Sequence, residues 1–71
     1  MQEMSPAEGR RFEGLPVLMT TAEVAEALKV DPSTLCRWRA AGSGPRVTWL
    51  SRGTPRYQTH HVQAWIERAA S

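Results

Sequence analysis

The chain has 71 residues, a formal net charge of +2 and a single cysteine. A chain this short forms one small domain, and one cysteine excludes an internal disulfide framework. The Cys and His residues do not have the spacing of a structural zinc site, so we expect no metal or other cofactor and a core built only from apolar side chains.

The apolar residues also argue against a membrane protein. No apolar run approaches the roughly 20 residues that span a bilayer, and the N-terminus lacks the charged and apolar regions of a signal peptide. We therefore expect a cytoplasmic protein with no membrane partner.

Charge is divided unevenly along the chain. Residues 1–31 hold three basic and six acidic residues, a net charge of −3, whereas residues 32–71 hold six arginines and one glutamate, a net charge of +5. Arginine is preferred to lysine where a planar fork binds phosphate or a base edge. The asymmetry therefore indicates a polyanionic partner, and we expect nucleic acid.

Residues 1–16 predict a flexible N-terminal tail, and residues 17–69 predict the folded domain. Residues 1–14 are rich in charge, and Phe12 is their only large apolar side chain besides the methionines. We interpret the tail as a dispensable, solvated extension, with contact to a partner as the alternative. The apolar residues 15–19 are expected to pack onto the first helix.

The first helix has a recognisable start. Thr20 and Glu23 match the Ser/Thr-x-x-Glu capping box, in which each side chain accepts a hydrogen bond from the backbone of the other. Apolar residues then recur on one face, which predicts a helix over residues 21–28. Lys29 and Val30 are expected to form the turn that follows.

A second helix start comes directly after this turn. Asp31 is a favourable N-cap, and Pro32 suits the first helical position, where no backbone hydrogen bond is lost. We predict a helix over residues 32–41 that ends at Gly42. Two helices joined by so short a turn are typical of a helix-turn-helix.

The rest of the chain predicts a β-hairpin and a last helix. Residues 46–50 favour a strand, residues 51–55 a turn and residues 56–58 a second short strand. Thr59 is expected to cap the final helix, whose apolar stripe contains Val62, Trp65 and Ile66. The fold class is therefore mainly α with a small β-hairpin, a winged helix-turn-helix.

The second helix is the candidate recognition helix, because the exposed residues near the start of such a helix meet base edges in the major groove. We expect Arg37 to bind a base, most often guanine through its O6 and N7 atoms. Ser33 and Thr34 can donate hydrogen bonds to a phosphate or to a base, although Ser33 is as easily an ordinary first-turn residue. Arg39 lies on another side of the helix, so we expect a phosphate contact or a solvated charge.

Further contacts are expected from the first helix and the hairpin. Thr20 and Thr21 stand at the start of the first helix, which crosses the DNA backbone in such folds. Arg52 and Arg56 flank a narrow Gly-Thr-Pro tip, where they either read minor-groove shape or only neutralise phosphates. Arg46 begins the hairpin and would contact the backbone, if it contacts DNA at all.

The aromatic residues have a structural and a functional interpretation. Aromatic side chains can stack on unpaired bases, but Trp38 and Trp65 lie on helical apolar stripes and are expected in the core. The sequence leaves Trp49 and Tyr57 open between these two roles.

Other reactive residues are also better explained by structure. His60 and His61 are neighbours that point in different directions, so we expect exposed or capping roles, and Cys36 is expected to be a small apolar filler. The sequence has no paired carboxylates, no Gly-rich phosphate loop and no nucleophile beside a base. We therefore expect a binding protein and not an enzyme.

These motifs carry a family resemblance over residues 17–68. The segments Thr-x-x-Glu-Val-Ala, Val-Asp-Pro-Ser-Thr-Leu-x-Arg-Trp, Pro-Arg-Tyr and Val-x-x-Trp-Ile resemble the MerR-like winged helix-turn-helix superfamily, and most of all its small phage and plasmid excisionases, or recombination directionality factors. The resemblance implies that the second helix enters the major groove and the wing the adjacent minor groove. It assigns groove contacts to Ser33, Thr34 and Arg37 and wing contacts to Arg52 and Arg56.

One segment departs from the family pattern. The wing tip reads Arg52-Gly53-Thr54-Pro55, where related sequences have a turn like Gly-Gly-His-Arg-Arg. We also expect no room for the long dimerisation helix and effector site of full-length MerR regulators, because the chain ends at Ser71.

Three functions follow as hypotheses. The first is an excisionase that binds double-stranded DNA cooperatively, through head-to-tail self-association on direct repeats, bends an attachment site and helps an integrase to excise. The second is a small transcriptional regulator of the same fold. The third is a protein-interaction module whose basic half binds an acidic protein.

Overall fold

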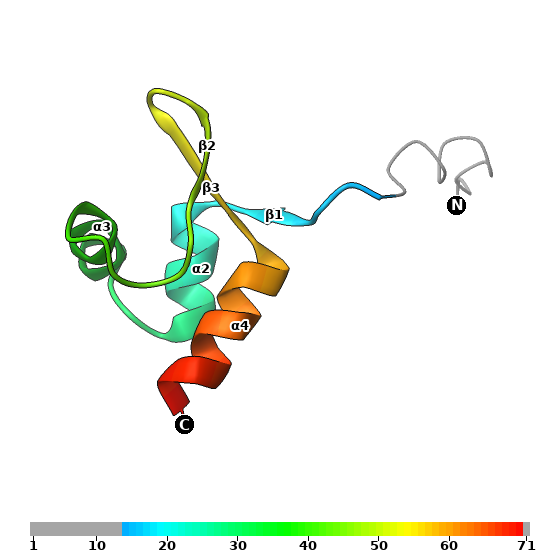
Figure 1. Ribbon diagram of the computed structural model, residues 1–71. Helices are drawn as coiled ribbons and strands as arrows, with labels where there is room; N and C mark the ends of the chain where they lie inside the picture. Colours follow the sequence, from blue (N-terminus) through cyan, green and yellow to red (C-terminus); the bar gives the residue numbers. More distant parts are fainter. Residues whose placement is uncertain (1–13, 71) are drawn as a thin grey trace, which may run out of the picture.

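A computed structural model describes residues 14–70 and shows a winged helix-turn-helix (Figure 1). The elements follow in the order β1 (Leu18–Met19), α2 (Thr21–Leu28), α3 (Pro32–Ala40), β2 (Thr48–Ser51), β3 (Thr54–Gln58) and α4 (Thr59–Ala70). The predicted fold class is therefore confirmed. The predicted tail, residues 1–16, lies mostly outside the described residues, so its boundary with the domain stays a prediction.

Helix α2 begins and ends through local hydrogen bonds. The backbone N–H of Glu23 donates to Thr20 Oγ1 at 3.1 Å, and the N–H of Thr20 donates to Glu23 Oε1 at 2.8 Å. At the other end, Val30 N–H bonds to the carbonyl of Ala25 and Lys29 N–H to that of Glu26, with Lys29 in the left-handed conformation at φ 62°. This is a Schellman ending, and it turns the chain towards α3.

Helix α3 has a start and an ending of the predicted kinds. Asp31 is the N-cap and accepts from the backbone N–H of Ser33 at 2.9 Å. After Ala40 the chain makes a second Schellman ending, in which Ser43 N–H bonds to the carbonyl of Trp38 and Gly42 has φ 76°. The predicted boundaries of both helices agree with the structure to within one residue.

The sheet contains a strand that the sequence did not predict. Its order is β1-β3-β2, and both pairs are antiparallel. Leu18 pairs with Gln58 and Met19 with Tyr57, and the carbonyl of Val17 accepts from the backbone N–H of Thr59. The segment before α2 is thereby attached to the last residues of β3, at the base of the hairpin.

The hairpin turn is shorter than predicted. Ser51 pairs with Thr54, so only Arg52 and Gly53 lie between the strands, whereas we had expected a turn over residues 51–55. Pro55 lies inside β3, beside a register shift between Trp49 and Ser51. Such a bulge tolerates a residue without an N–H, and therefore the proline does not end the strand.

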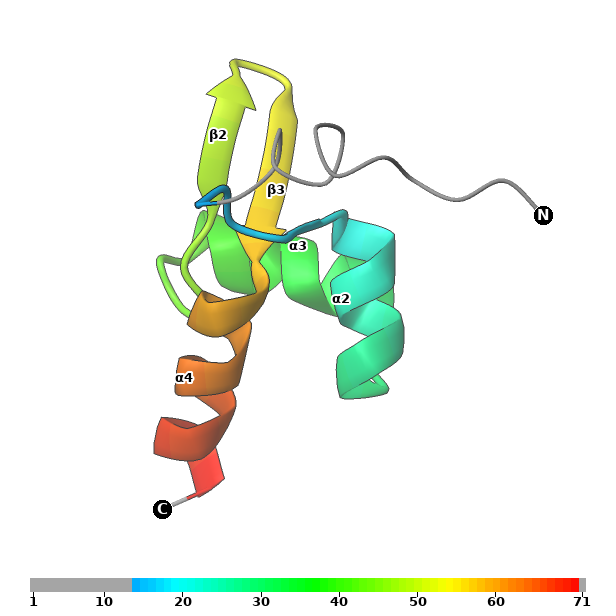
Figure 2. The same cartoon turned by 90° about the vertical axis from the view of Figure 1, so that its right-hand side faces the viewer.

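Helix α4 also begins differently from the prediction. Thr59 is its first helical residue and not a preceding cap, and its N–H donates to the carbonyl of Val17. Figure 2 shows α4 running away from the β2–β3 hairpin, so the hairpin and the end of α4 lie at opposite ends of the molecule.

A small core joins the helices to the sheet. Its buried residues are Val24, Ala25, Leu35, Tyr57 and Val62. Tyr57, with 1% of its surface exposed, is therefore a core residue, which settles one of the two open aromatic positions. Trp38 packs against this core, and its ring lies 5.4 Å from that of Trp65.

Two expectations about apolar packing are wrong. Ile66 is 43% exposed, since it lies one turn beyond the buried Val62 on a helix that runs away from the hairpin (Figure 2). Cys36 is exposed and does not fill the core. It follows the buried Leu35 on the helix, and neighbouring helical positions point about 100° apart.

Candidate nucleic-acid interface

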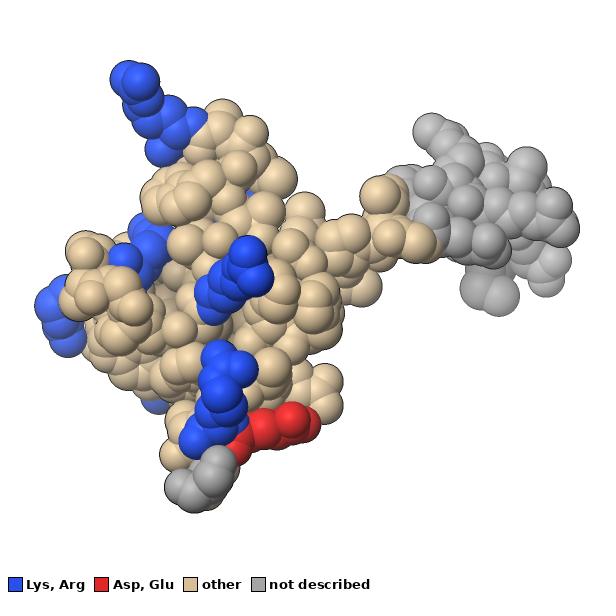
Figure 3. Space-filling view, in the orientation of Figure 1, with Lys and Arg blue, Asp and Glu red and all other residues tan. Residues whose placement is uncertain are grey.

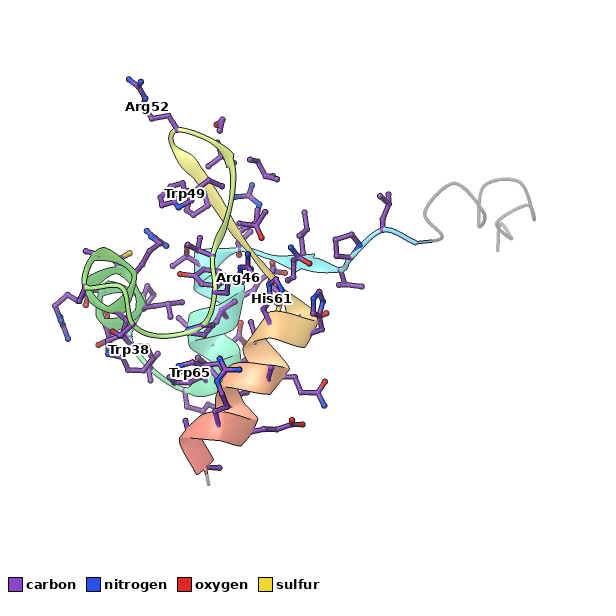
Figure 4. The ribbon with its side chains drawn as sticks, viewed as in Figure 1. Trp38, Arg46, Trp49, Arg52, His61 and Trp65 are labelled. Atoms are coloured by element: carbon purple, nitrogen blue, oxygen red, sulfur yellow. The ribbon has the colours of Figure 1, made fainter. Side chains whose placement is uncertain are left out.

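Helix α3 and the β2–β3 hairpin, which we call the wing, define one side of the molecule. The wing rises past α3, and the labelled side chains of Trp49 and Arg52 point towards the side on which α3 lies (Figure 4). Arg52 occupies the turn at the end of the wing and extends away from the body. This arrangement presents a helix and a hairpin tip to one partner.

Arg37 is exposed on α3, and its side chain is oriented along the helix. Its Nη2 donates to Thr34 Oγ1 at 3.1 Å, a contact between residues three positions apart. The structure therefore brings together the two residues that we expected to enter the groove, and Arg37 keeps further donors for a base edge. Both residues lie in the part of α3 that meets bases in such folds.

Ser33 has a structural role in the first turn. Its hydroxyl donates to Asp31 Oδ1 at 2.7 Å, in addition to the backbone bond. These bonds lower the pKa of Asp31, with a smaller effect from the positive charge of Arg37. The Ser33 hydroxyl would have to break its hydrogen bond to Asp31 before it could donate to DNA. In this structure Ser33 is therefore a residue of the first helical turn, and its DNA contact stays a prediction.

The two threonines at the start of α2 accept hydrogen bonds. Thr20 Oγ1 accepts in the capping box, and Thr21 Oγ1 accepts from Arg39 Nη1 at 3.1 Å. In these bonds each hydroxyl is the acceptor, so its own hydrogen can be donated to a phosphate. The start of α2 is therefore suited to the backbone contact expected of a first helix.

Arg39 is half-buried and bound to several elements. Its Nη1 donates to Thr21 Oγ1 and to Tyr57 OH, both at 3.1 Å, and its Nη2 to Cys36 Sγ at 3.5 Å. Its Cζ lies 5.5 Å from the centroid of the Trp49 ring. The hydrogen bond that Arg39 donates to Tyr57 is the main cause that raises the pKa of Arg39 further. The expectation of a solvated charge is therefore wrong, and the phosphate contact stays a prediction.

The two wing arginines are not equivalent. Arg52 is exposed at the tip, whereas Arg56 is half-buried on β3, where it pairs with Thr48 and donates to the carbonyl of Pro55 at 2.8 Å. Its charge also contributes to the lowered pKa of Glu23, behind the two hydrogen bonds to Thr20. We had expected both arginines to flank the tip, but the short turn leaves that position to Arg52.

Arg46 lies at the base of the wing. It precedes β2 and is exposed, and in Figure 4 it lies beside His61 of α4. The pKa of His61 is lowered by desolvation first, then by the charges of His60 and Arg46. Arg46 is thus placed apart from the tip that carries Arg52, and its expected DNA contact stays a prediction.

Basic side chains are spread over the face shown in Figure 3. Some project from the end of the wing and from the α3 side, and others lie at the centre of this face and beside the acidic atoms near the end of α4 (Figure 3). On this face the α3 side and the wing show basic charge without visible acidic atoms, which is favourable for a polyanion.

Comparison with protein families shows which family the chain belongs to. A family model described as a helix-turn-helix domain matches residues 18–70, more than half of the 71-residue chain. The chain belongs to this family. A comparison with curated proteins gives no match. For this helix-turn-helix protein, the match runs from the first residue of β1 to the last of α4, and it supports a DNA-binding function.

Residues 14–70 contain neither a candidate metal site nor a candidate membrane span. No group of three or more His, Cys, Asp or Glu residues in this range could hold a metal ion. Within the same range, no helix has the length and apolar character needed to cross a membrane.

Sequence reasoning missed the role of Tyr57 and left Trp49 undecided. Both contact Arg39, which is 18 residues from Tyr57 and 10 from Trp49 along the chain. A pattern based on helical or strand periodicity cannot report such contacts. The sequence offered one signal for these contacts, which is that Arg39 directly follows Trp38 on the predicted helix.

Proposed function

We propose that this helix-turn-helix protein is an excisionase-like architectural factor that binds and bends duplex DNA. Helix α3 enters the major groove, and the wing lies over the adjacent minor groove. The observation that supports this most directly is that α3 and the wing tip each present an exposed arginine, Arg37 and Arg52, and that Arg52 points towards the side on which α3 lies (Figure 4). The MerR-like character that the sequence motifs suggest belongs to the same proposal.

The geometry supports a proposed role for each residue of the interface. Arg37 binds a base edge, and Thr34 orients it through the hydrogen bond at 3.1 Å. Thr20 and Thr21 contact phosphates beside the major groove, and Arg52 approaches the minor groove. Arg56 is held on β3 by Pro55, so it neutralises phosphates at most.

The size of the domain argues for more than one copy on DNA. A single module of this kind has a small footprint, so occupancy and specificity improve when neighbouring copies bind together. Head-to-tail copies on direct repeats would bend the duplex and help an integrase to excise. This role is binding without catalysis and takes place on cytoplasmic DNA.

Two alternatives use different partners. A small transcriptional regulator would use the same interface on a promoter, without bending repeats and without an effect on recombination. A protein-interaction module would direct the basic second half of the chain, with its net charge of +5, to an acidic protein.

The first experiment selects bound duplexes from a random pool and measures gel shifts of the enriched site. We expect a repeated motif, stepwise cooperative occupancy, and an Arg37→Ala variant that loses discrimination at one base position, worth about 1 to 3 kcal/mol. Arg68→Ala on α4 is the matched control, since it removes the same charge outside the proposed interface. If the duplex is not retained even near 50 mM salt, where phosphate contacts are strong, the protein-interaction module replaces DNA binding.

The second experiment separates an excisionase from a regulator. Gel mobility of permuted fragments measures bending, and a recombination assay with a cognate integrase measures excision. Curvature that increases with each added copy, together with stimulated excision, supports the excisionase. Independent binding to straight promoter DNA would instead support the regulator.

A further inference from the structure

The contacts of Arg39 connect four elements. The guanidinium bonds to Thr21 at the start of α2 and to Tyr57 of β3, and it lies against Trp49 of β2. Arg39 itself belongs to α3. One side chain of the recognition helix therefore contacts the first helix, the sheet and the wing.

The geometry of a guanidinium suits these contacts. Its planar fork can hold two oxygen acceptors at once, and its face can lie over an aromatic ring. Nη1 donates its two hydrogens to Thr21 Oγ1 and Tyr57 OH, and the distance from Cζ to the centroid of the Trp49 ring is 5.5 Å. Tyr57 is 1% exposed, so Arg39 is anchored to a rigid part of the core.

Besides the buried Tyr57 of β3, Arg39 contacts the wing at Trp49 of β2. The indole is 52% exposed and points to the side on which α3 lies (Figure 4). A two-stranded hairpin has little stability by itself, and the wing projects from the body (Figure 2). A contact from α3 to this indole therefore limits how far the wing can move relative to the recognition helix.

We propose that Arg39 is a positioning residue that holds the wing at a fixed separation from the recognition helix through Trp49. The inference rests on the proposed DNA binding by α3 and the wing. It assigns Arg39 a function beyond a phosphate contact. The two groove contacts, Arg37 and Arg52, are then presented to DNA at a set distance, and wing binding depends on Arg39.

The first test compares two duplexes. A long duplex contains the footprint of α3 and of the wing, and a short one is trimmed to the footprint of α3. Arg39→Met is expected to weaken binding to the long duplex about tenfold, a loss in the range of one hydrogen bond and one cation–π contact, with little change on the short duplex. The matched control, Arg37→Met on the same helix, should weaken both duplexes equally.

Variants distinguish positioning from charge and from misfolding. Arg39→Lys keeps the positive charge but loses the fork, so the deficit on the long duplex should persist; full rescue by lysine would overturn the inference. Trp49→Leu leaves the hydrogen bonds of Arg39 in place and should reproduce the deficit. The double variant should be no weaker than either single one, and additive losses would show two separate DNA contacts instead.

The second test needs no DNA. The ¹⁵N relaxation of the Trp49 indole N–H is measured in the free protein, with the resonance identified by its absence in Trp49→Leu. We expect an ordered indole in the original protein and a clearly lower order parameter in Arg39→Met, but not in Arg37→Met. If the original protein binds no duplex, the proposed function fails, while this measurement still decides the inference. An indole equally ordered in both proteins would overturn it.

Discussion

At the residue scale, Gly44 allows a close approach between the connection that follows α3 and a tryptophan of the core. Gly44 has φ 81°, and a Cβ added there would lie 3.1 Å from Trp38 Cβ and 3.2 Å from Trp38 Cε3. Trp38 in turn packs on Trp65 of α4. The glycine therefore lets the chain between α3 and the wing lie directly on an aromatic pair.

The prediction at this scale is that Gly44→Ala is more destabilising than Gly42→Ala. Both glycines have positive φ, but a Cβ at Gly42 meets nothing within 4 Å. Gly42→Ala should cost about 1 kcal/mol from backbone strain alone, and Gly44→Ala about 1 to 3 kcal/mol more from the steric conflict. Urea unfolding measures both, and equal losses would contradict the close approach to Trp38.

At the element scale, the helix starts depend on ionised carboxylates. The hydrogen bonds to Thr20 lower the pKa of Glu23 from its ordinary value of 4.5, and those to Ser33 lower the pKa of Asp31 from 3.8. Each carboxyl is therefore deprotonated at a lower pH in the folded than in the unfolded chain. Its contribution to stability is complete above the ordinary pKa and is lost as the pH falls through the lowered one.

The resulting prediction concerns acid unfolding. The melting temperature should be insensitive to these two groups above about pH 5 and should fall as the pH drops below 4.5 and then below 3.8. Glu23→Gln should reduce the upper part of this loss, because glutamine still accepts from Thr20 but does not titrate. Glu26→Gln on the same helix is the control, and an identical effect of both variants would argue against the capping box as the source.

The turn between α2 and α3 also carries a predicted stabilising change. Lys29 has φ 62°, which is unfavourable for a residue with a Cβ and favourable for glycine. Lys29→Gly should therefore raise the free energy of unfolding by about 1 kcal/mol. Lys29→Ala removes the same charge but keeps the Cβ, so it should give no such gain in thermal unfolding.

At the scale of the whole molecule, charge is concentrated where DNA is proposed to bind. The basic second half of the chain supplies both Arg37 on α3 and Arg52 at the wing tip. Phosphate neutralisation releases counterions, so affinity falls steeply with salt concentration. The steepness reports how many basic groups contact the duplex at once.

The prediction at this scale is a reduced salt dependence in interface variants. Arg52→Ala should lower the slope of log affinity against log salt by about 1, whereas a base-reading Arg37 should change discrimination more than the slope. Arg46 lies next to His61 at the base of the wing, apart from Arg52. This position favours the alternative that Arg46 does not contact DNA, so Arg46→Ala should leave the slope nearly unchanged. If Arg46→Ala instead lowered the slope by a full unit, the duplex would contact the base of the wing, contrary to our proposal.

The helix-turn-helix can be predicted from local sequence patterns alone. The caps at Thr20, Glu23 and Asp31 and the endings at Lys29 and Gly42 act between residues at most five positions apart. Local patterns of this kind are legible without a fold, because the helix backbone brings such residues together wherever the helix lies. For the same reason the pairing of Arg37 with Thr34 on one face of α3 agrees with the sequence.

Contacts between elements that are far apart in the sequence could not be predicted and depend on the tertiary structure. Strand β1 exists because it pairs with β3 about 40 residues later, Tyr57 is buried because β3 crosses the core, and Arg39 finds partners 18 residues away in both directions. The division of roles between Arg52 and Arg56 follows from the register of the wing. Such contacts depend on how separate elements pack against one another, and a periodic pattern within one element carries no information about that packing.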